Sequence, residues 1–264
     1  FNRAYQSYRQ PGSAIKPVII YTPYFERGHK PTDIVKDAPI KDGPKNSGGS
    51  YLGSITVRTA VERSVNTVAW NLFGELTPKV CMSYMYRMGF ARLSRKDYNH
   101  ASALGGLTNG VSPVEMASAY AAIENEGAYR EPTCIIKITD SRGNVIFDDS
   151  MRTKEQVYDS NAAAMMTDVM EGVLTRGTAG GYALDNMSCA GKTGTTNDKK
   201  DGWFAGYTPY YTTVVWVGYD MPKSVNDLLG NTYPLRIWHN FMSGIHTGLE
   251  NIEFPEYEGE EKDK

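Results

Sequence analysis

Ser13 and Lys16 have the residue types and the spacing of a nucleophile and its base. Ser13 follows Pro11-Gly12 and opens an apolar segment that ends at Tyr21. A helix that begins at Ser13 places Lys16 one turn later on the same face. A serine hydroxyl is a weak nucleophile without a base, and a lysine becomes a base when burial and nearby cations lower its pKa. The pair therefore predicts acyl transfer through Ser13.

The motif Ser64-Val65-Asn66 lies where one predicted helix stops and another starts. A junction of this kind lets short polar side chains point into a cleft. Ser64 could relay a proton to a leaving amine, and Asn66 could bind a substrate amide or orient Lys16. A second copy of the pattern, Ser224-Val225-Asn226, comes after the last predicted strand and is interpreted as an ordinary polar loop.

Lys192-Thr193-Gly194-Thr195 lies at the end of a predicted strand. The two-residue period of a strand places Thr193 and Thr195 on one face and Lys192 on the other. Two hydroxyls on one face can bind a carboxylate, and Lys192 adds positive potential at the edge of the cleft. Gly194 would let a ligand backbone approach as an added strand. The N–H of Thr195 could join that of Ser13 in an oxyanion hole.

Each motif taken alone also has an ordinary structural interpretation. These are an N-capping serine beside a solvated lysine, a helix cap, and a strand end that enters a polar loop. Chance predicts about one SxxK and about one SxN in a chain of this composition, but only about 0.1 KTG. The order of the three motifs, and the elements predicted around them, therefore carry the argument.

Helices and an antiparallel sheet are expected to position these motifs. Helices are predicted from Thr56 toward Ser64, from Thr77-Pro78 to about Gly89, from the capping box at Ser112, and from Ser160. A last helix carries an apolar stripe assigned to the core, formed by Leu235, Trp238, Phe241, Met242 and Ile245. A hairpin is predicted at 133–138 and 144–147, and a three-stranded meander at 188–195, 203–208 and 211–219. The stretch 28–50, rich in Gly, Pro, Lys and Asp, is interpreted as a long surface loop, and loops of that length are often functional. Helices around a mainly antiparallel sheet indicate a mixed α/β (α+β) fold.

Composition excludes several classes of function. The 264 residues carry a formal net charge of -2, which argues against nucleic-acid binding through bulk positive charge. No apolar run approaches the ~20 residues that a membrane-spanning helix needs. The four histidines show no metal-ligand spacing, so neither a metal nor a cofactor is predicted. The three cysteines, Cys81, Cys134 and Cys189, form no CxxC pattern and are interpreted as buried free thiols.

The order SxxK, SxN and KTG resembles that of penicillin-binding proteins and serine β-lactamases. Five longer segments closely resemble class A penicillin-binding proteins, and the resemblance runs from residue 1 to about 242. The segments are 9–13 (RQPGS), 103–113 (ALGGLTNGVSP), 190–196 (AGKTGTT), 201–209 (DGWFAGYTP) and 216–220 (WVGYD). The resemblance implies a β-lactamase/transpeptidase-like fold, with an antiparallel sheet flanked by helices.

The family implies a D,D-transpeptidase that cross-links peptidoglycan stem peptides. Ser13 would attack the D-Ala-D-Ala carbonyl of a donor stem peptide and release D-Ala, and the amine of an acceptor stem peptide would take the acyl group. The resemblance gives Lys16 the role of base and gives Ser64 and Asn66 relay and orienting roles. The donor carboxylate would be held by Lys192, Thr193, Gly194 and Thr195. β-Lactams would acylate Ser13, and hydrolysis of that adduct should be slow.

Two alternatives remain. A class A β-lactamase needs a carboxylate that activates water, usually in an ExxLN pattern, and the nearest match, Glu171-Gly172-Val173-Leu174-Thr175, lacks the Asn. Val65 also stands where β-lactamases usually have Asp. The second alternative is a penicillin-binding module that senses or scaffolds without turnover, against which the intact motifs argue.

One departure from the family concerns the start of the chain. Only twelve residues precede Ser13, so the strands that usually open the sheet are expected to be missing, as are the glycosyltransferase module and the membrane anchor. The prediction is an N-terminally truncated transpeptidase domain over 1–249 and a disordered acidic tail over 250–264. Its sheet would be built mainly from 188–219, with an edge that is either exposed or covered by a partner segment supplied elsewhere. The parent protein would be anchored at the extracytoplasmic face of the bacterial membrane.

Overall fold

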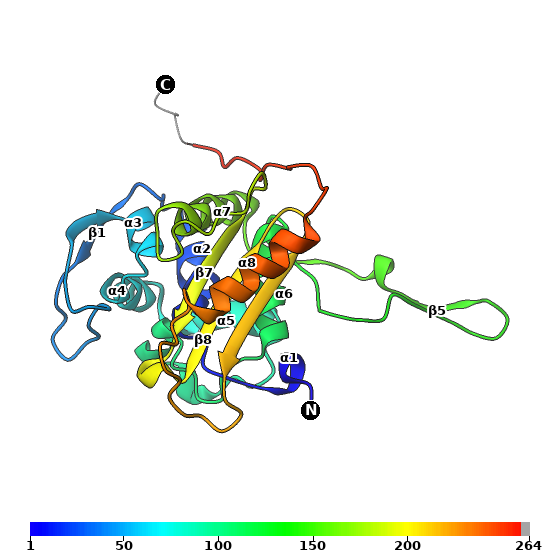
Figure 1. Ribbon diagram of the computed structural model, residues 1–264, viewed down its shortest axis with the longest axis horizontal. Coiled ribbons are helices and arrows are strands. Elements are labelled where there is room, and N and C mark those ends of the chain that lie inside the picture. The colour runs from blue at the N-terminus through cyan, green and yellow to red at the C-terminus, as the bar shows by residue number, and fades with distance from the viewer. Residues whose placement is uncertain (260–264) are drawn as a thin grey trace.

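A three-stranded antiparallel sheet organises the fold, and helices cover both of its faces (Figure 1). The computed structural model describes residues 1–259. The sheet order is β7-β8-β9, with strands β7 (Ala190–Thr195), β8 (Asp201–Tyr207) and β9 (Thr212–Gly218). Thr193 pairs with Phe204, which in turn pairs with Val215, and both pairings are antiparallel. The meander predicted from the sequence is therefore confirmed.

Helix α8 (Tyr233–Ile245) crosses one face of the sheet, and the other helices gather on the opposite side (Figure 1). The expected stripe on α8 is only partly correct. Leu235, Trp238 and Met242 are buried, whereas Phe241 is 52% exposed and Ile245 is 36% exposed. The helix has a sheet on one side only, so a stripe as wide as the predicted one cannot be covered completely.

The segment that begins at Ser13 forms the central helix of the core. It starts as a 3-10 turn, η1 (Gly12–Ile15), continues as a π-helical stretch, η2 (Pro17–Tyr21), and ends as α2 (Thr22–Phe25). Pro17 has no N–H and therefore cannot make the bond to the Ser13 carbonyl that a regular α-helix requires. The Lys16 N–H makes a tighter bond to that carbonyl instead. The predicted helix is confirmed, with this local change of pitch.

The remaining helices follow their capping signals. Thr56 caps α3 through a bond from the Thr59 N–H, and the capping box at Ser112 and Glu115 is present in full. Helix α7 begins at Ser160, as predicted, and Asp159 is its N-cap. The helices are α1 (Arg3–Gln6), α3 (Val57–Glu62), α4 (Asn66–Leu76), α5 (Pro78–Arg87), α6 (Pro113–Glu124) and α7 (Ser160–Thr175), with short 3-10 helices η3 (Arg95–Asp97), η4 (His100–Leu104), η5 (Asp149–Met151) and η6 (Asn197–Lys199).

The stretch from residue 28 to 50, expected to be a surface loop throughout, contains a strand. β1 (Ile34–Asp37) pairs antiparallel with β2 (Gly53–Thr56), and Ile34 lies opposite Thr56. The strand has polar and exposed residues, so its sequence carries no clear alternation of apolar and polar positions. The pairing folds residues 38–52 into a long hairpin loop beside the Ser64 motif.

The predicted hairpin is confirmed but is shorter than expected. Strands β4 (Lys137–Thr139) and β5 (Val145–Asp148) project from the body of the molecule (Figure 1). Strands β3 (Ala128–Tyr129) and β6 (Glu155–Gln156) pair with each other in a separate two-stranded sheet. Cys134 is exposed, which contradicts its assignment as a buried thiol, while Cys81 and Cys189 are buried and free as expected.

Residues 250–259 run along the domain without forming a helix or a strand. The ring of Phe254 packs edge-on against Tyr207, with 5.6 Å between the ring centroids. This contact differs from the disordered tail that the composition predicts. The remainder of that tail, 260–264, lies outside the described residues, and the domain boundary after residue 249 stays a prediction.

Candidate active site

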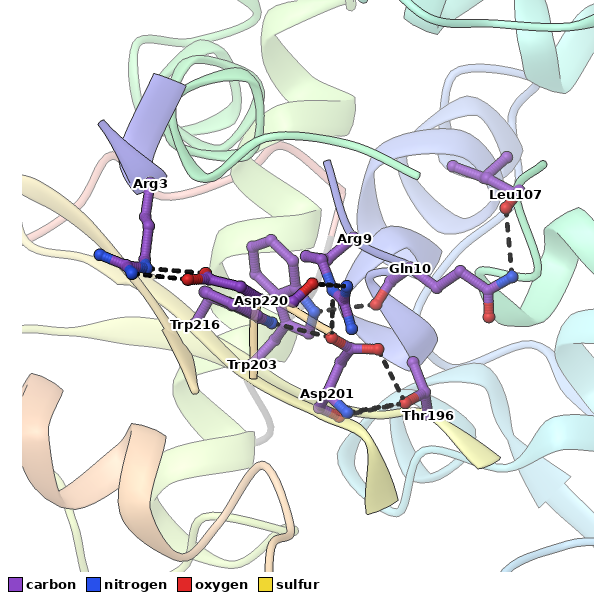
Figure 2. A network of polar contacts seen from close by, with 9 residues as sticks. All are labelled: Arg3, Arg9, Gln10, Leu107, Thr196, Asp201, Trp203, Trp216 and Asp220. Carbon is purple, nitrogen blue, oxygen red and sulfur yellow. Dashed lines mark hydrogen bonds and ion pairs between the residues drawn. The ribbon is translucent and has the colours of Figure 1, made fainter. Parts of the chain in front are cut away.

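A buried ion pair anchors the chain just before Ser13 to the sheet (Figure 2). Arg9 Nε donates to Asp201 Oδ1 at 2.7 Å, and both side chains are less than 10% exposed. Trp216 Nε1 donates to the same carboxylate oxygen at 3.0 Å. Trp203 Nε1 donates to the carbonyl of Gln10 at 2.8 Å. These bonds fix the chain segment that leads to Ser13 against strands β8 and β9.

Backbone packing around Ser13 leaves no room for side chains at three glycines. Gly12 and Gly105 both have positive φ, at 55° and 80°, and a Cβ on Gly105 would lie 2.4 Å from the nitrogen of Gly12. A Cβ on Gly194 would lie 2.3 Å from the carbonyl oxygen of Pro11. The sequence predicted that a ligand backbone approaches Gly194, but here the backbone of Pro11 lies against it. Strand β7 thus packs directly against the turn that carries Ser13.

Lys16 is fully buried and faces the Ser64 motif. Its Nζ donates to the carbonyl of Ser64 at 3.0 Å, to that of Val65 at 3.3 Å, and to Asn66 Oδ1 at 2.8 Å. Burial, and in second place the nearby charge of Lys192, lower the pKa of Lys16 well below its ordinary value. The hydrogen bond from Lys16 to Asn66 is consistent with the orienting role predicted for Asn66.

Ser64 lies between two buried lysines. Lys16 contacts its carbonyl, and Lys192 Nζ donates to its Oγ at 2.8 Å. Burial lowers the pKa of Lys192 to about 7. Ser64 has a φ of 56°, a left-handed conformation that a residue other than glycine adopts at an energetic cost. This conformation turns the chain between α3 and α4.

Ser13 is half-buried, and its hydroxyl makes no hydrogen bond within the described part of the chain. The expected contact between Ser13 and Lys16 is absent, because Lys16 donates to the Ser64 motif instead. Ser13 opens into a cavity of about 450 Å³ that also exposes Ser64, Asn66, Thr193 and Thr195. This cavity, termed the Ser13 cavity below, brings all three sequence motifs together.

The hydroxyls on strand β7 face the Ser13 cavity, as the strand period predicts. Thr193 Oγ1 shares a hydrogen bond with Thr178 Oγ1 at 2.8 Å. Thr195 Oγ1 accepts from the Gly230 N–H at 2.9 Å. Lys192 is fully buried on the other side of the pleat and reaches Ser64 instead of the cleft edge. It thus lies deeper than the sequence interpretation placed it.

The sequence motifs did not reveal the residues that support Asn66. Asn46 Oδ1 accepts from the Asn66 N–H at 2.9 Å, and Asn46 Nδ2 donates to Asp37 Oδ1 at 2.7 Å. Burial opposes ionisation of Asp37, but bonds from Thr67, Asn46 and the Leu52 N–H outweigh it and lower the pKa of this carboxyl. The unusual length of the 28–50 stretch was the one available signal, since long loops are often functional.

Glu171 and Ser224, to which no catalytic role was assigned from the sequence, lie apart from the three motifs. Burial raises the pKa of Glu171 to about 7, yet Glu171 does not line the Ser13 cavity. Ser224 Oγ donates to the carbonyl of Asp198 in a surface loop. Within residues 1–259, no three His, Cys, Asp or Glu side chains are grouped so that they could hold a metal ion. No helix of the described part is both long enough and apolar enough to cross a membrane.

A serine at the start of a buried helix, packed against an antiparallel sheet and beside two buried lysines, defines the β-lactamase/transpeptidase-like class of fold. Residues 1–242 match the family described as "Penicillin binding protein transpeptidase domain". The chain belongs to this family. The fold and the family expected from the sequence are thereby confirmed.

Relatives and solved structures agree with this assignment. The chain is 38% identical over 250 residues to Penicillin-binding protein 4 of Bacillus subtilis, covering 93% of this chain and 40% of that protein. It is 37% identical over 259 residues to Penicillin-binding protein 1A of Neisseria meningitidis, covering 92% and 32%. The chain thus spans less than half of the length of these two relatives.

Penicillin-Binding Protein 1A from Haemophilus influenzae has a similar structure, with a TM-score of 0.85, 25% identity and coverage of 97% of this chain and 45% of that chain. The PonA1 protein from Mycobacterium tuberculosis in complex with penicillin V is similar at a TM-score of 0.84 and 28% identity, covering 98% and 74%.

Proposed function

We propose that this domain is a serine D,D-transpeptidase that joins peptidoglycan stem peptides through an acyl-enzyme on Ser13. The observation that carries the proposal is the position of Ser64 between Lys16 and Lys192 in the cavity that Ser13 opens into. Acyl transfer through a serine needs groups that take the proton of the nucleophile, give a proton to the leaving amine, and reverse both steps when the acyl group is passed on. The match to the transpeptidase family favours transfer over hydrolysis. The two buried lysines have lowered pKa values, which suits them to that task.

Acylation begins when the neutral amine of Lys16 accepts the Ser13 hydroxyl proton. To do so, Lys16 releases one of its three contacts with the Ser64 motif and turns a lone pair to Ser13. Ser13 Oγ then forms a bond to the carbonyl carbon of the donor's penultimate D-Ala. The C–N bond to the terminal D-Ala breaks, and the leaving amine takes a proton from Ser64 while Lys192 resupplies Ser64.

Strand β7 binds the donor in this proposal. Thr193 and Thr195 present hydroxyls to the donor's terminal carboxylate, and Lys192 contributes positive potential behind them. The N–H groups of Ser13 and Thr195 form the oxyanion hole, since a Cβ on Gly12 would lie 2.9 Å from the Thr195 nitrogen. An amine of a second stem peptide then attacks the acyl carbon and releases Ser13.

The parent protein is proposed to carry a glycosyltransferase module and a membrane anchor, and to act at the extracytoplasmic face of the bacterial membrane. This proposal rests on the family and on relatives named as penicillin-binding proteins that are longer than this chain. The same structural class includes PonA1 in complex with penicillin V. β-Lactams are therefore proposed to acylate Ser13 as donor analogues.

Labelling with a fluorescent penicillin tests the proposal directly. We expect one stable adduct, mapped to Ser13 by mass spectrometry, that the Ser13→Ala variant lacks and that Ser83→Ala, a change at an exposed serine on α5, retains. An adduct elsewhere refutes the assignment of the nucleophile. Rapid loss of the adduct as penicilloate supports a β-lactamase. A stable adduct without release of D-Ala from a stem-peptide donor supports a sensor module.

A further inference from the structure

A second cavity, which no sequence motif predicted, adjoins the Ser13 cavity at Ser64. It has a volume of about 360 Å³ and is termed the arginine cavity here. Asp37, Ser50, Arg63 and Arg176 are among the residues that line it. It shares Asn46, Ser47, Arg63, Ser64 and Thr178 with the Ser13 cavity, so the two spaces adjoin each other at Ser64.

The charged groups that line the arginine cavity are Asp37, Arg63 and Arg176. Asp37 is 1% exposed, and its carboxylate accepts hydrogen bonds from Asn46, Thr67 and the Leu52 N–H, so these bonds leave Arg63 without a contact to it. Arg176 forms a paired contact with Glu62, through bonds of 2.6 and 3.2 Å. Arg63 is exposed, and its guanidinium has no ion pair or hydrogen bond within residues 1–259.

An unpaired guanidinium at the junction of two cavities is suited to bind a carboxylate, because its donors match the two oxygens of that group. The hydroxyls of Ser47, Ser50 and Thr178 add further hydrogen-bonding groups in the same space. In the proposed reaction the donor peptide occupies the Ser13 cavity, where β7 holds its terminal carboxylate. The arginine cavity is therefore the space that remains for a second peptide.

We infer that the arginine cavity is the acceptor site and that Arg63 selects an acceptor amine that carries a carboxylate. This inference rests on the proposed transpeptidase function. The acceptor's amine reaches the acyl carbon on Ser13 past Ser64, the one motif residue that both cavities share. There the C–N bond forms, the C–O bond to Ser13 breaks, and the proton of the amine returns to the Ser13 oxygen through the lysines and Ser64.

Two acceptors that share one amine test the inference. A D-Ala-D-Ala stem peptide serves as donor, and the acceptor is either a D-amino acid or its carboxamide. For Arg63→Gln we expect the apparent KM of the carboxylate acceptor to rise about 10-fold and the KM of the amide to stay unchanged. The rate of penicillin acylation should also stay unchanged. Arg63→Lys should recover part of the loss, and Lys79→Gln, the same charge change at an exposed site on α5, should have no effect.

Equal effects on both acceptors, or no effect on either, would overturn the role of Arg63. Slower acylation by the donor would place Arg63 in the donor site instead. A second measurement does not depend on turnover. Calorimetric binding of the carboxylate acceptor to the Ser13→Ala protein should weaken about 10-fold when Arg63→Gln is added, and unchanged binding refutes the site. Failure to form any acyl-enzyme would refute the proposed function alone.

Discussion

Replacing Asp201 by Asn leaves the guanidinium of Arg9 inside the protein without its charged partner. The two side chains are only 7% and 9% exposed and meet at 2.7 Å. Breaking a buried pair by removing one charge costs about 3–5 kcal/mol, a large part of the roughly 5–15 kcal/mol that keeps a domain folded. An unfolding entropy of about 2.1 cal/mol/K per residue converts this to a fall in Tm of about 5–9 °C.

The same substitution should also slow acylation, because the Arg9–Asp201 pair holds the chain four residues before Ser13. A displacement of about 1 Å at a reacting atom costs about 10²-fold in rate, so we expect penicillin labelling to slow by about 10- to 100-fold. Scanning calorimetry measures the first effect and stopped-flow labelling the second. Asp220→Asn is the matched control, since its pair with Arg3 lies at the surface in the same network (Figure 2).

A double-mutant cycle decides whether the pair itself is responsible. Replacing both Arg9 and Asp201 by apolar residues of similar size should recover most of the lost stability, because no unpaired charge remains. The reasoning is refuted if Asp201→Asn lowers Tm no more than Asp220→Asn does, or if the coupling energy between Arg9 and Asp201 is below about 1 kcal/mol.

Three further outcomes are expected. Folding lowers the pKa of Lys192 from 10.5 to about 7, so the unfolded chain binds more protons than the folded chain between these pH values. The wild type should therefore gain stability relative to Lys192→Met as the pH rises from 7 to 10. A stability difference in urea unfolding that does not change with pH would contradict this. Asn66→Ala removes one of the three acceptors that contact Lys16 Nζ and should slow penicillin acylation about 10-fold. An unchanged rate would show that other groups orient Lys16. Gly105→Ala should lower Tm and the rate of penicillin labelling far more than Gly181→Ala does. Both glycines have positive φ, but only a Cβ at Gly105 would clash with the backbone. Equal effects of the two substitutions would show that the close packing at Gly105 is not needed.

Several elements could be predicted because their signals are local. The capping box at Ser112 joins residues three positions apart, and the three strands from Ala190 to Gly218 follow one another in the chain with short connections. The helix at Ser13 follows from an apolar segment, interrupted by Lys16, behind a turn. Each of these rests on backbone geometry within a few residues, so the chain's own order contains the information.

Other features depended on partners that are distant in the sequence. Strand β1 in the 28–50 stretch exists because β2 pairs with it, and its own residues show little strand character. Phe241 was assigned to the core by its spacing, yet it is 52% exposed on a helix that packs mainly against strands β8 and β9. Arg63 carries no local signal, since any exposed arginine before a motif has the same sequence appearance.

The sequence by itself determined which side chains could perform acyl transfer, namely Ser13, Lys16, Ser64, Asn66 and the Lys192 strand. It did not determine which of them touch. The tertiary structure turned Lys16 toward Ser64, 48 residues away, and brought Lys192 to the hydroxyl of Ser64 from a distance of 128 residues. A buried lysine lies where hydrogen-bond acceptors compensate its lost hydration, and only the packing of the helices against the sheet decides where those acceptors are.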